Sequence, residues 1–318
     1  MVPADITPRR DDANRSAHVR SRLGVATVVL AAGTLEATFV PELGMVGLSF
    51  RHDGDELLAL PGGASAYRAG HQAGLPLLAP WANRLGDHVY EAAGVTVDLA
   101  DLDPGVDDNG LPIHGTMTAR TGWEISSLVP GCVRARFDYG ARPDLLAAFP
   151  FPHELVVEAT LDEHALTITT TLRATGSRAV PIAFGWHPYL RLPRSSRRSW
   201  RLLHPAWEHL ELDDRGLPTG RSTPEEAADQ PLGHRTFDDL YALGDDRTLA
   251  LEDRRRCLNV SFDEGYPYAQ VFAPPGSAFV CLEPMTGPTN ALGQGTCRLV
   301  APGDDFTARF SIEPGWLG

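Results

Sequence analysis

Apolar and polar residues alternate with a period of two along much of this 318-residue chain. The alternation is clearest in residues 34–39, 133–139, 166–173 and 306–312. Such a pattern is typical of a β-strand that has one face on a core and the other in water. Long apolar stripes at helical spacing are absent from the sequence, while 31 glycines and 26 prolines supply turns. The pattern therefore predicts an all-β fold, a large antiparallel β-sandwich with few short helices.

Shorter signals predict local features of this fold. Asp162-Glu163-His164 separates two alternating runs and predicts a hairpin connection. Thr223-Pro224-Glu225-Glu226 combines a capping threonine, a proline and early acids, which predicts a short helix. Residues 1–22 are rich in Arg, Asp, Ser and Ala without periodicity and predict a flexible leader. No linker interrupts residues 23–318, which we expect to form a single domain.

The composition restricts the partners and the location. The net charge is -13, and all 28 basic residues are arginines, so a nucleic acid partner is not expected. No apolar run approaches the roughly 20 residues of a membrane span, and the first residues lack the apolar core of a signal peptide. We therefore expect a cytoplasmic protein that does not bind membranes, either a monomer or a homodimer.

A carboxylate at the end of an apolar run is the first candidate for chemistry. Residues 278–282 read as a buried strand, Glu283 ends it, and Pro284 begins a segment that cannot continue it. A rigid strand opening into a loop would hold Glu283 still, as a catalytic group requires. The alternative is an ordinary acid at the end of a strand.

Two further polar segments follow apolar stretches. Asn83 and Arg84 come after a long apolar approach, so they would need acceptors if drawn inward. A sugar hydroxyl would serve, and so would a nearby carboxylate in a structural salt bridge. His114 directly precedes Gly115, a residue that permits close approach, although a histidine that caps a turn is the simpler alternative.

Aromatic residues flank the second histidine of interest. His187 lies between Trp186 and Tyr189, and aromatic faces beside an imidazole suit a pyranose ring. The alternative is aromatic core beside a turn fixed by proline. Asp238 begins an acidic pair inside an apolar frame, a pattern that also occurs in solvated turns.

Together these residues form a general acid/base set without a nucleophile motif. Phosphate-loop, dinucleotide and nucleophile-elbow motifs are absent from the sequence, so no cofactor is expected. His114, His187, Asp238 and Glu283 could in principle ligate a metal, but they are far apart in sequence and no metal is expected. Among the four cysteines, Cys281 would face the same side of the strand as Glu283. A catalytic role is open to it, although packing beside the site is the simpler interpretation.

In order and spacing, these motifs resemble those of the aldose 1-epimerase (mutarotase) family, over roughly residues 25–315. The motifs are Pro80-Trp81-Ala82-Asn83-Arg84, Ile113-His114-Gly115, Phe149-Pro150-Phe151-Pro152-His153-Glu154-Leu155, Gly185-Trp186-His187-Pro188-Tyr189, Phe237-Asp238-Asp239-Leu240-Tyr241 and Leu282-Glu283-Pro284. The resemblance implies a galactose mutarotase-like β-sandwich. It also implies an isomerase that interconverts the α and β anomers of a monosaccharide without a cofactor.

By this resemblance, Glu283 is the catalytic base and His187 the catalytic acid. The substrate-binding residues would be His114, Arg84, Asn83, Asp238 and Trp186. Asp238 is preferred to Asp239 because of its spacing to Tyr241. The residues around Glu283, His187 and His114 depart from the galactose-type pattern, which leaves the sugar unassigned.

Three alternatives remain open at this point. A hexose-6-phosphate 1-epimerase would share the fold and the acid/base pair but would need arginines for the phosphate, such as Arg68, Arg191 or Arg194. A non-catalytic sugar-binding protein could keep the fold, although it has no use for a paired acid and base. A polysaccharide lyase or a related sandwich enzyme is more distant.

Overall fold

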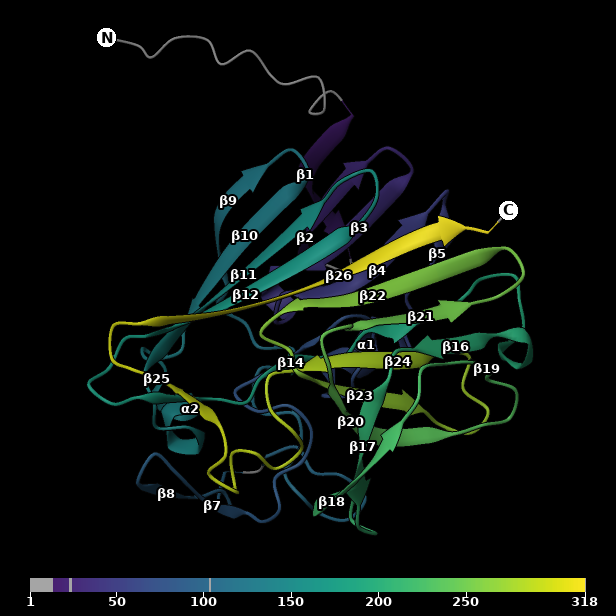
Figure 1. Ribbon diagram of the computed structural model, residues 1–318. Helices are drawn as coiled ribbons and strands as arrows, with labels where there is room; N and C mark the ends of the chain where they lie inside the picture. The colour runs from purple at the N-terminus through teal and green to yellow at the C-terminus, as the bar shows by residue number, and fades with distance from the viewer. Residues whose placement is uncertain (1–13, 23–24, 103, 318) are drawn as a thin grey trace, which may run out of the picture.

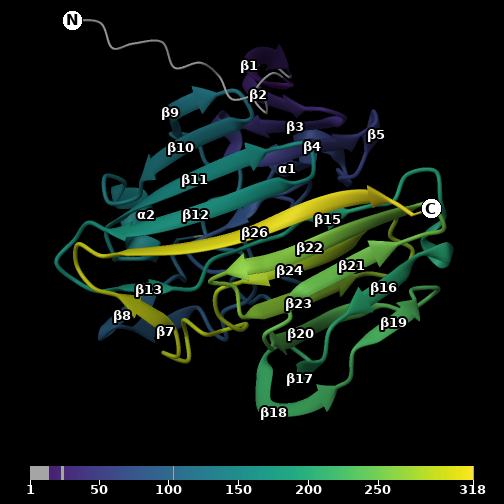
Figure 2. The same ribbon diagram turned by 45° about the horizontal axis from the view of Figure 1, so that its top comes forward.

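Two large antiparallel sheets dominate the computed structural model, which describes residues 14–22, 25–102 and 104–317. Figures 1 and 2 show the nine-stranded and the eight-stranded sheet as two layers that lie against each other. The nine-stranded sheet has the order β19 (Ala228–Pro231), β16 (Arg201–His204), β21 (Thr248–Glu252), β22 (Arg256–Glu264), β26 (Asp305–Trp316), β12 (Leu166–Ala174), β11 (His153–Leu161), β10 (Cys132–Asp138) and β9 (Glu124–Val129). The predicted antiparallel β-sandwich is confirmed.

The eight-stranded sheet carries most of the candidate residues. Its order is β18 (Pro218–Glu225), β17 (Trp207–Leu212), β20 (Phe237–Leu243), β23 (Tyr268–Ala273), β24 (Val280–Met285), β14 (Gly185–Trp186) and β6 (Leu77–Leu78), and β15 (Tyr189–Leu190) also pairs with β24. All six residues of β24 are buried, because strands pair with it on both sides and other layers cover it. The middle of this sheet is therefore a rigid support for side chains.

Smaller sheets and short helices complete the described part of the chain. A five-stranded sheet contains β1 (Arg15–Arg22), β2 (Val25–Ala32), β3 (Leu35–Val40), β4 (Val46–His52) and β5 (Asp55–Glu56). Two-stranded sheets join β13 (Val180–Ile182) to β25 (Arg298–Val300) and β7 (Val89–Ala92) to β8 (Val95–Asp98). The helical segments are α1 (Gly63–Arg68), α2 (Pro143–Ala148), η2 (Pro41–Leu43) and η3 (Arg197–Ser199). Neither described α-helix has the length and apolarity that crossing a membrane would need.

Side chains from both large sheets meet in one apolar core. The Trp186 ring of β14 lies 6.0 Å from the Phe310 ring of β26. Its indole N–H donates to the Thr170 hydroxyl of β12 at 3.0 Å. Alternation along β12 and β26 buries every second residue against this core, as the period-two pattern predicts.

The β11–β12 connection confirms the predicted hairpin. The Asp162 carboxylate accepts hydrogen bonds from the backbone N–H groups of His164, at 2.8 Å, and Ala165, at 2.9 Å. An aspartate that bonds to the backbone two and three residues further on fixes a tight turn. The turn in this way sets the register of β11 and β12, which pair over nine residues each.

The predicted helix at residues 223–226 is wrong. Thr223, Pro224 and Glu225 belong to β18, which pairs with β17 at the edge of the eight-stranded sheet. The Glu225 carboxylate accepts from the Trp207 indole N–H at 2.8 Å and contacts His209 at 3.0 Å. Proline is tolerated in an edge strand, so pairing with β17 outweighs the local capping signal.

The first described strand lies within residues 1–22, which the sequence predicts to be a flexible leader. Residues 15–22 form β1, which pairs antiparallel with β2 along its whole length. An edge strand can form through backbone hydrogen bonds alone, without an apolar face. Since residues 15–22 show no apolar alternation, their sequence does not reveal this strand. Residues 1–13 of the expected leader lie outside the described residues.

Candidate active site

Ten residues from separate segments of the chain line one pocket of ≈ 140 Å³. They come from the connections near residues 83 and 113, from the segment around β14 and β15, and from β20, β23 and β24. The lining residues are Asn83, Arg84, Ile113, His114, His187, Tyr189, Asp238, Gln270, Phe272 and Glu283. The structure thus brings together six of the seven site residues expected from the sequence.

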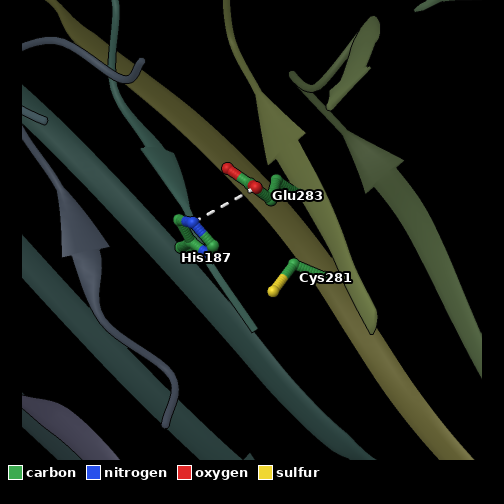
Figure 3. A group of neighbouring side chains, drawn as sticks. All are labelled: His187, Cys281 and Glu283. Atoms are coloured by element: carbon green, nitrogen blue, oxygen red, sulfur yellow. Dashed lines mark ion pairs between the residues drawn. The ribbon is translucent and has the colours of Figure 1, made fainter. Parts of the chain in front are cut away.

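Glu283 and His187 face each other at the centre of the pocket. The Glu283 carboxylate, on β24, lies 3.3 Å from Nε2 of His187, which follows β14 (Figure 3). The two residues are 1% and 4% exposed. Within the described residues, Glu283 Oε2 and His187 Nδ1 have no hydrogen-bond partner. Since buried polar atoms in folded proteins nearly always have partners, these atoms indicate a place for a polar ligand.

Burial opposes charge on both members of this pair. Burial raises the pKa of Glu283 well above its usual range, with a smaller upward contribution from Asp238. Burial also lowers the pKa of His187 well below 6.5, and neighbouring His114 lowers it further. An unpaired carboxylate and an unpaired imidazolium are both disfavoured, so the pair keeps one proton between them near neutral pH. A shared proton gives the site one group able to accept a proton and one able to donate.

Aromatic contacts hold the His187 ring in place. Its ring stacks on Tyr189, with centroids 4.5 Å apart and planes 8° from parallel. The rings of His114 and Phe272 meet it nearly edge-on, at 5.4 and 6.0 Å. The His187 backbone N–H donates to the Pro76 carbonyl at 3.1 Å. These contacts leave the Nε2 edge directed at Glu283.

A tight backbone crossing positions His114. Its own φ is +63° and that of Gly115 is +69°, both in the left-handed region. A Cβ on Gly115 would lie 2.1 Å from the Ala79 carbonyl oxygen, so only glycine fits there. The His114 N–H donates to the Asn83 carbonyl at 3.0 Å. Burial, and then the charge of Arg84, lower the pKa of His114 to about 3, so its imidazole is neutral.

Arg84 is fixed by carboxylates while it lines the pocket. Its Nε donates to Asp107 at 2.6 Å, Nη1 donates to the Asn83 side-chain oxygen at 3.2 Å, and Nη2 donates to Asp238 at 3.3 Å. The two interpretations of Arg84, a structural salt bridge and a pocket residue, therefore both apply. Asp107, which accepts from Arg84, is a residue of the site that sequence reasoning missed. Its place in a turn predicts only the hydrogen bonds that it accepts from the backbone N–H groups of Asn109 and Leu111.

The pocket contains Asp238 and not Asp239. Asp238 accepts from the Gln270 side-chain amide at 2.6 Å, whereas Asp239 lies 3.3 Å from His209. Neighbouring residues on a strand point to opposite faces, which explains the separation. Gln270 is a second missed residue. It lies opposite Glu283 in the β23–β24 register and is 1% exposed, so a glutamine inside an apolar strand is the signal that could have found it.

The aldose 1-epimerase family model matches residues 27–313 of this chain. The chain belongs to the aldose 1-epimerase family. The Escherichia coli protein YihR, which is uncharacterized, is 25% identical over 85% of this chain and 86% of its own.

Solved structures of the family share the same fold. A galactose mutarotase-like protein from Clostridium acetobutylicum is 18% identical, with 96% of this chain and 99% of that chain covered and a TM-score of 0.81. A galactose 1-epimerase from Lactobacillus acidophilus is 14% identical, with 96% and 100% covered and a TM-score of 0.74. At these identities the likeness supports the fold alone.

Trp186 is not a pocket residue of this aldose 1-epimerase family member, and its expected contact with substrate is wrong. Its side chain is 0% exposed and is bonded to Thr170 inside the sandwich. Trp186 and His187 are adjacent in an extended segment, so their side chains leave on opposite faces. The aromatic rings that line the pocket are instead those of Tyr189 and Phe272.

Cys281 lies beside the Glu283–His187 pair in this member of the family. Its thiol, the His187 imidazole and the Glu283 carboxylate each offer a ligand atom, and these atoms all lie within 4.8 Å of one another. Burial, and then the Glu283 charge, raise the pKa of the Cys281 thiol well above 9.0. A thiol held protonated is a poor nucleophile, which favours packing beside the site over catalysis by Cys281. His114 and Asp238 are not part of this group of possible metal ligands.

Proposed function

We propose that this protein is an aldose 1-epimerase that interconverts the α and β anomers of a free hexose by general acid/base catalysis. The observation that carries the proposal is the buried Glu283–His187 pair, 3.3 Å apart in a pocket lined by polar groups and aromatic rings. Anomerisation needs one group that accepts the proton of the C1 hydroxyl and one that donates a proton to the ring oxygen. The pair offers both.

The reaction proceeds by ring opening and closure. In the form of the pair that has the shared proton on His187, the Glu283 carboxylate accepts the proton of the C1 hydroxyl while the His187 imidazolium donates its proton to the ring oxygen. The bond between C1 and the ring oxygen breaks, which leaves an open-chain aldehyde. Rotation about the C1–C2 bond presents the other carbonyl face, and the reverse transfers close the ring and restore both proton states.

The remaining lining residues would bind the sugar. The guanidinium of Arg84 and the carboxylate of Asp238 are held rigidly, so they can meet hydroxyl groups without further ordering. Gln270 Oε1 and His114 Nδ1 have no partner within the described residues and are further candidates for hydroxyl contacts. The faces of Tyr189 and Phe272 suit the C–H faces of a pyranose. Neutral His114 beside His187 would bind without competing for the shared proton.

Several observations favour a free sugar over a sugar phosphate. Arg84 is the single arginine that lines the pocket, among described residues, and it already contacts two carboxylates. The arginines expected to bind a phosphate, Arg68, Arg191 and Arg194, do not line it. Arg194 instead pairs with Asp55 at 2.7 Å. A dianionic phosphate would therefore meet carboxylates as well as Arg84 at this pocket.

The test is proton NMR or polarimetry of freshly dissolved α-D-glucose, α-D-galactose and α-D-glucose 6-phosphate, each with and without protein. We expect a faster approach to anomeric equilibrium with at least one free sugar, and a smaller effect with the phosphate. Acceleration of the phosphate alone would overturn the assignment to free sugars. Sugar binding without acceleration of any anomerisation would overturn the enzyme assignment and favour a non-catalytic binding protein.

A further inference from the structure

The reactive pair belongs to a compact group of three side chains with different donor atoms. Cys281 and Glu283 are two residues apart on β24 and therefore face the same side of the strand. His187 lies between β14 and β15, both of which pair with β24. Figure 3 shows the thiol and the carboxylate projecting from β24 toward the His187 ring. This arrangement follows from strand register and does not depend on a mobile loop.

The three donors match the preferences of one class of cation. Imidazole nitrogen, thiolate sulfur and carboxylate oxygen are the ligands that Zn²⁺ takes in proteins. Mg²⁺ and Ca²⁺ prefer sets of about six or more oxygens, which this group cannot supply. Three protein ligands also leave one position of a tetrahedral cation open to water or to a sugar hydroxyl.

The buried atoms around the group favour occupancy by a ligand. Cys281, His187 and Glu283 are 0%, 4% and 1% exposed, and Glu283 Oε2 has no hydrogen-bond partner within the described residues. Mutual distances of at most 4.8 Å require only small side-chain shifts for one ion to touch all three ligand atoms. The same shifts would replace the 3.3 Å contact between Glu283 and His187.

We propose that His187, Cys281 and Glu283 form an inhibitory binding site for a thiophilic divalent cation, of which Zn²⁺ is the representative. Binding releases the thiol proton of Cys281 and the proton shared by Glu283 and His187 to water, because a metal takes these ligands in their deprotonated forms. The bound cation occupies both groups that exchange protons with the sugar, so metal binding and catalysis exclude each other. Cys281 makes the site selective for soft cations. The inhibition rests on the proposed epimerase activity, whereas the metal binding does not.

Binding is tested first, with Co²⁺ as a spectroscopic probe for Zn²⁺. We expect one equivalent of Co²⁺ to produce a thiolate-to-cobalt charge-transfer band in the wild-type protein, and excess Zn²⁺ to abolish the band. Cys281→Ser should remove the band, and Cys281→Ala serves if the serine variant does not fold. Cys132→Ser is the matched control, because it removes a partly exposed thiol on β10 of the other large sheet. A band that survives in the Cys281 variants would overturn the proposal, as would no band in the wild type.

Inhibition is tested second, with each variant compared with its own metal-free rate. Zn²⁺ should slow anomerisation by the wild type and Cys132→Ser. At least roughly tenfold more Zn²⁺ should be needed for Cys281→Ser, because the loss of a partner outside the ligand set already lowers metal affinity about 10–100-fold and this variant loses a ligand. Equal sensitivity in all three proteins would overturn the proposal. If the wild type accelerates no anomerisation, the proposed function fails while the Co²⁺ band still decides whether the metal site exists.

Discussion

At the scale of single residues, the alternation of side chains between the two faces of a strand decides which of them reach the pocket. The polar segments between apolar runs, together with the resemblance to the aldose 1-epimerase family, name Glu283, His187, His114, Arg84, Asn83 and Asp238, all of which line one pocket. The sequence does not show which of Trp186 and His187 faces the pocket. The strand there is only two residues long, and an aromatic and a polar side chain would each suit a sugar site. Trp186 lies in the core and not, as the resemblance implies, against the substrate. Gln270 and Phe272 were missed because they lie in a strand without a motif.

Removing either member of the reactive pair should abolish most of the activity. We expect Glu283→Gln and His187→Asn each to lower the catalysed rate of anomerisation by about 10²–10⁴, because each removes one proton-transfer step. Polarimetry gives the rate, and circular dichroism checks that the fold is retained. A folded variant with near-wild-type rate would contradict the role assigned to the substituted residue.

The acidic pair on β20 allows a matched comparison. Asp238→Asn removes the charge that faces Arg84 and replaces one of the two oxygens that accept from Arg84 and Gln270 by an amide group that can only donate, whereas Asp239→Asn alters a contact with His209 outside the pocket. A hydrogen bond to a charged group contributes about 1.5–3 kcal/mol, so we expect Asp238→Asn to lower kcat/KM at least about tenfold. Asp239→Asn should leave kcat/KM close to wild type. Equal losses in steady-state kinetics of the two variants would contradict the selection of Asp238.

At the scale of elements, the site combines a rigid sheet with two tight connections. β24 presents Glu283 from the middle of the eight-stranded sheet, with β23 on one side and β14 and β15 on the other. The connection that carries His114 is fixed where Gly115 touches the backbone of Ala79. The proposed base Glu283 and the proposed sugar contacts Asp238 and Gln270 are thus held by the sheet, whereas the proposed sugar contacts Arg84 and His114 are held by connections.

Two glycines in the same segment separate a steric effect from backbone strain. Gly110 and Gly115 have φ of +75° and +69°, but a Cβ on Gly110 would meet nothing within 4 Å. We expect Gly110→Ala to cost about 1–2 kcal/mol of stability, the strain of a left-handed alanine. Gly115→Ala should cost more and should also lower kcat/KM, because relieving the clash moves His114. Urea unfolding and the rate of anomerisation measure the two effects, and equal stability losses would contradict the steric argument.

The period-two pattern predicted core strands well and edge strands poorly. The alternating runs at residues 133–139, 166–173 and 306–312 coincide with β10, β12 and β26, each of which has one face on the core. β1 and β18 lie at sheet edges, where backbone pairing suffices and no apolar face is needed. The sequence of β1 therefore predicts a flexible leader, and that of β18 predicts a capped helix, although both segments are strands.

At the scale of the whole molecule, a buried histidine links stability to pH. His153 of β11 is 0% exposed, stacks on Tyr139 at 4.4 Å and donates from Nδ1 to the Phe151 carbonyl at 2.7 Å. Burial lowers the pKa of His153 to about 4, against 6.5 in the unfolded chain. The unfolded state binds the proton first, so this contribution to stability is present above pH 6.5 and is lost as the pH falls toward 4.

The His153→Gln variant should show a weaker dependence of stability on pH. Between pH 7 and pH 5 we expect the wild type to lose about 2 kcal/mol through His153, and the variant to lose less by about that amount. Urea unfolding at both pH values gives the free energies of unfolding. His164→Gln is the matched control, because His164 is exposed in the β11–β12 turn. Parallel curves for the wild type and His153→Gln would contradict the assignment.

The division between sheet and connections has a consequence for how substrate preference can change over evolutionary time. Glu283 and His187 depend on pairing in the middle of a sheet, where most substitutions disturb the core. Asn83, Arg84 and His114 lie in connections between strands, and connections accept substitutions and changes of length more readily. A descendant of this chain could therefore change the sugar contacts proposed for Asn83, Arg84 and His114 by substitutions in two short segments, while the sheet kept the proposed proton-transfer pair and the contacts proposed for Asp238 and Gln270.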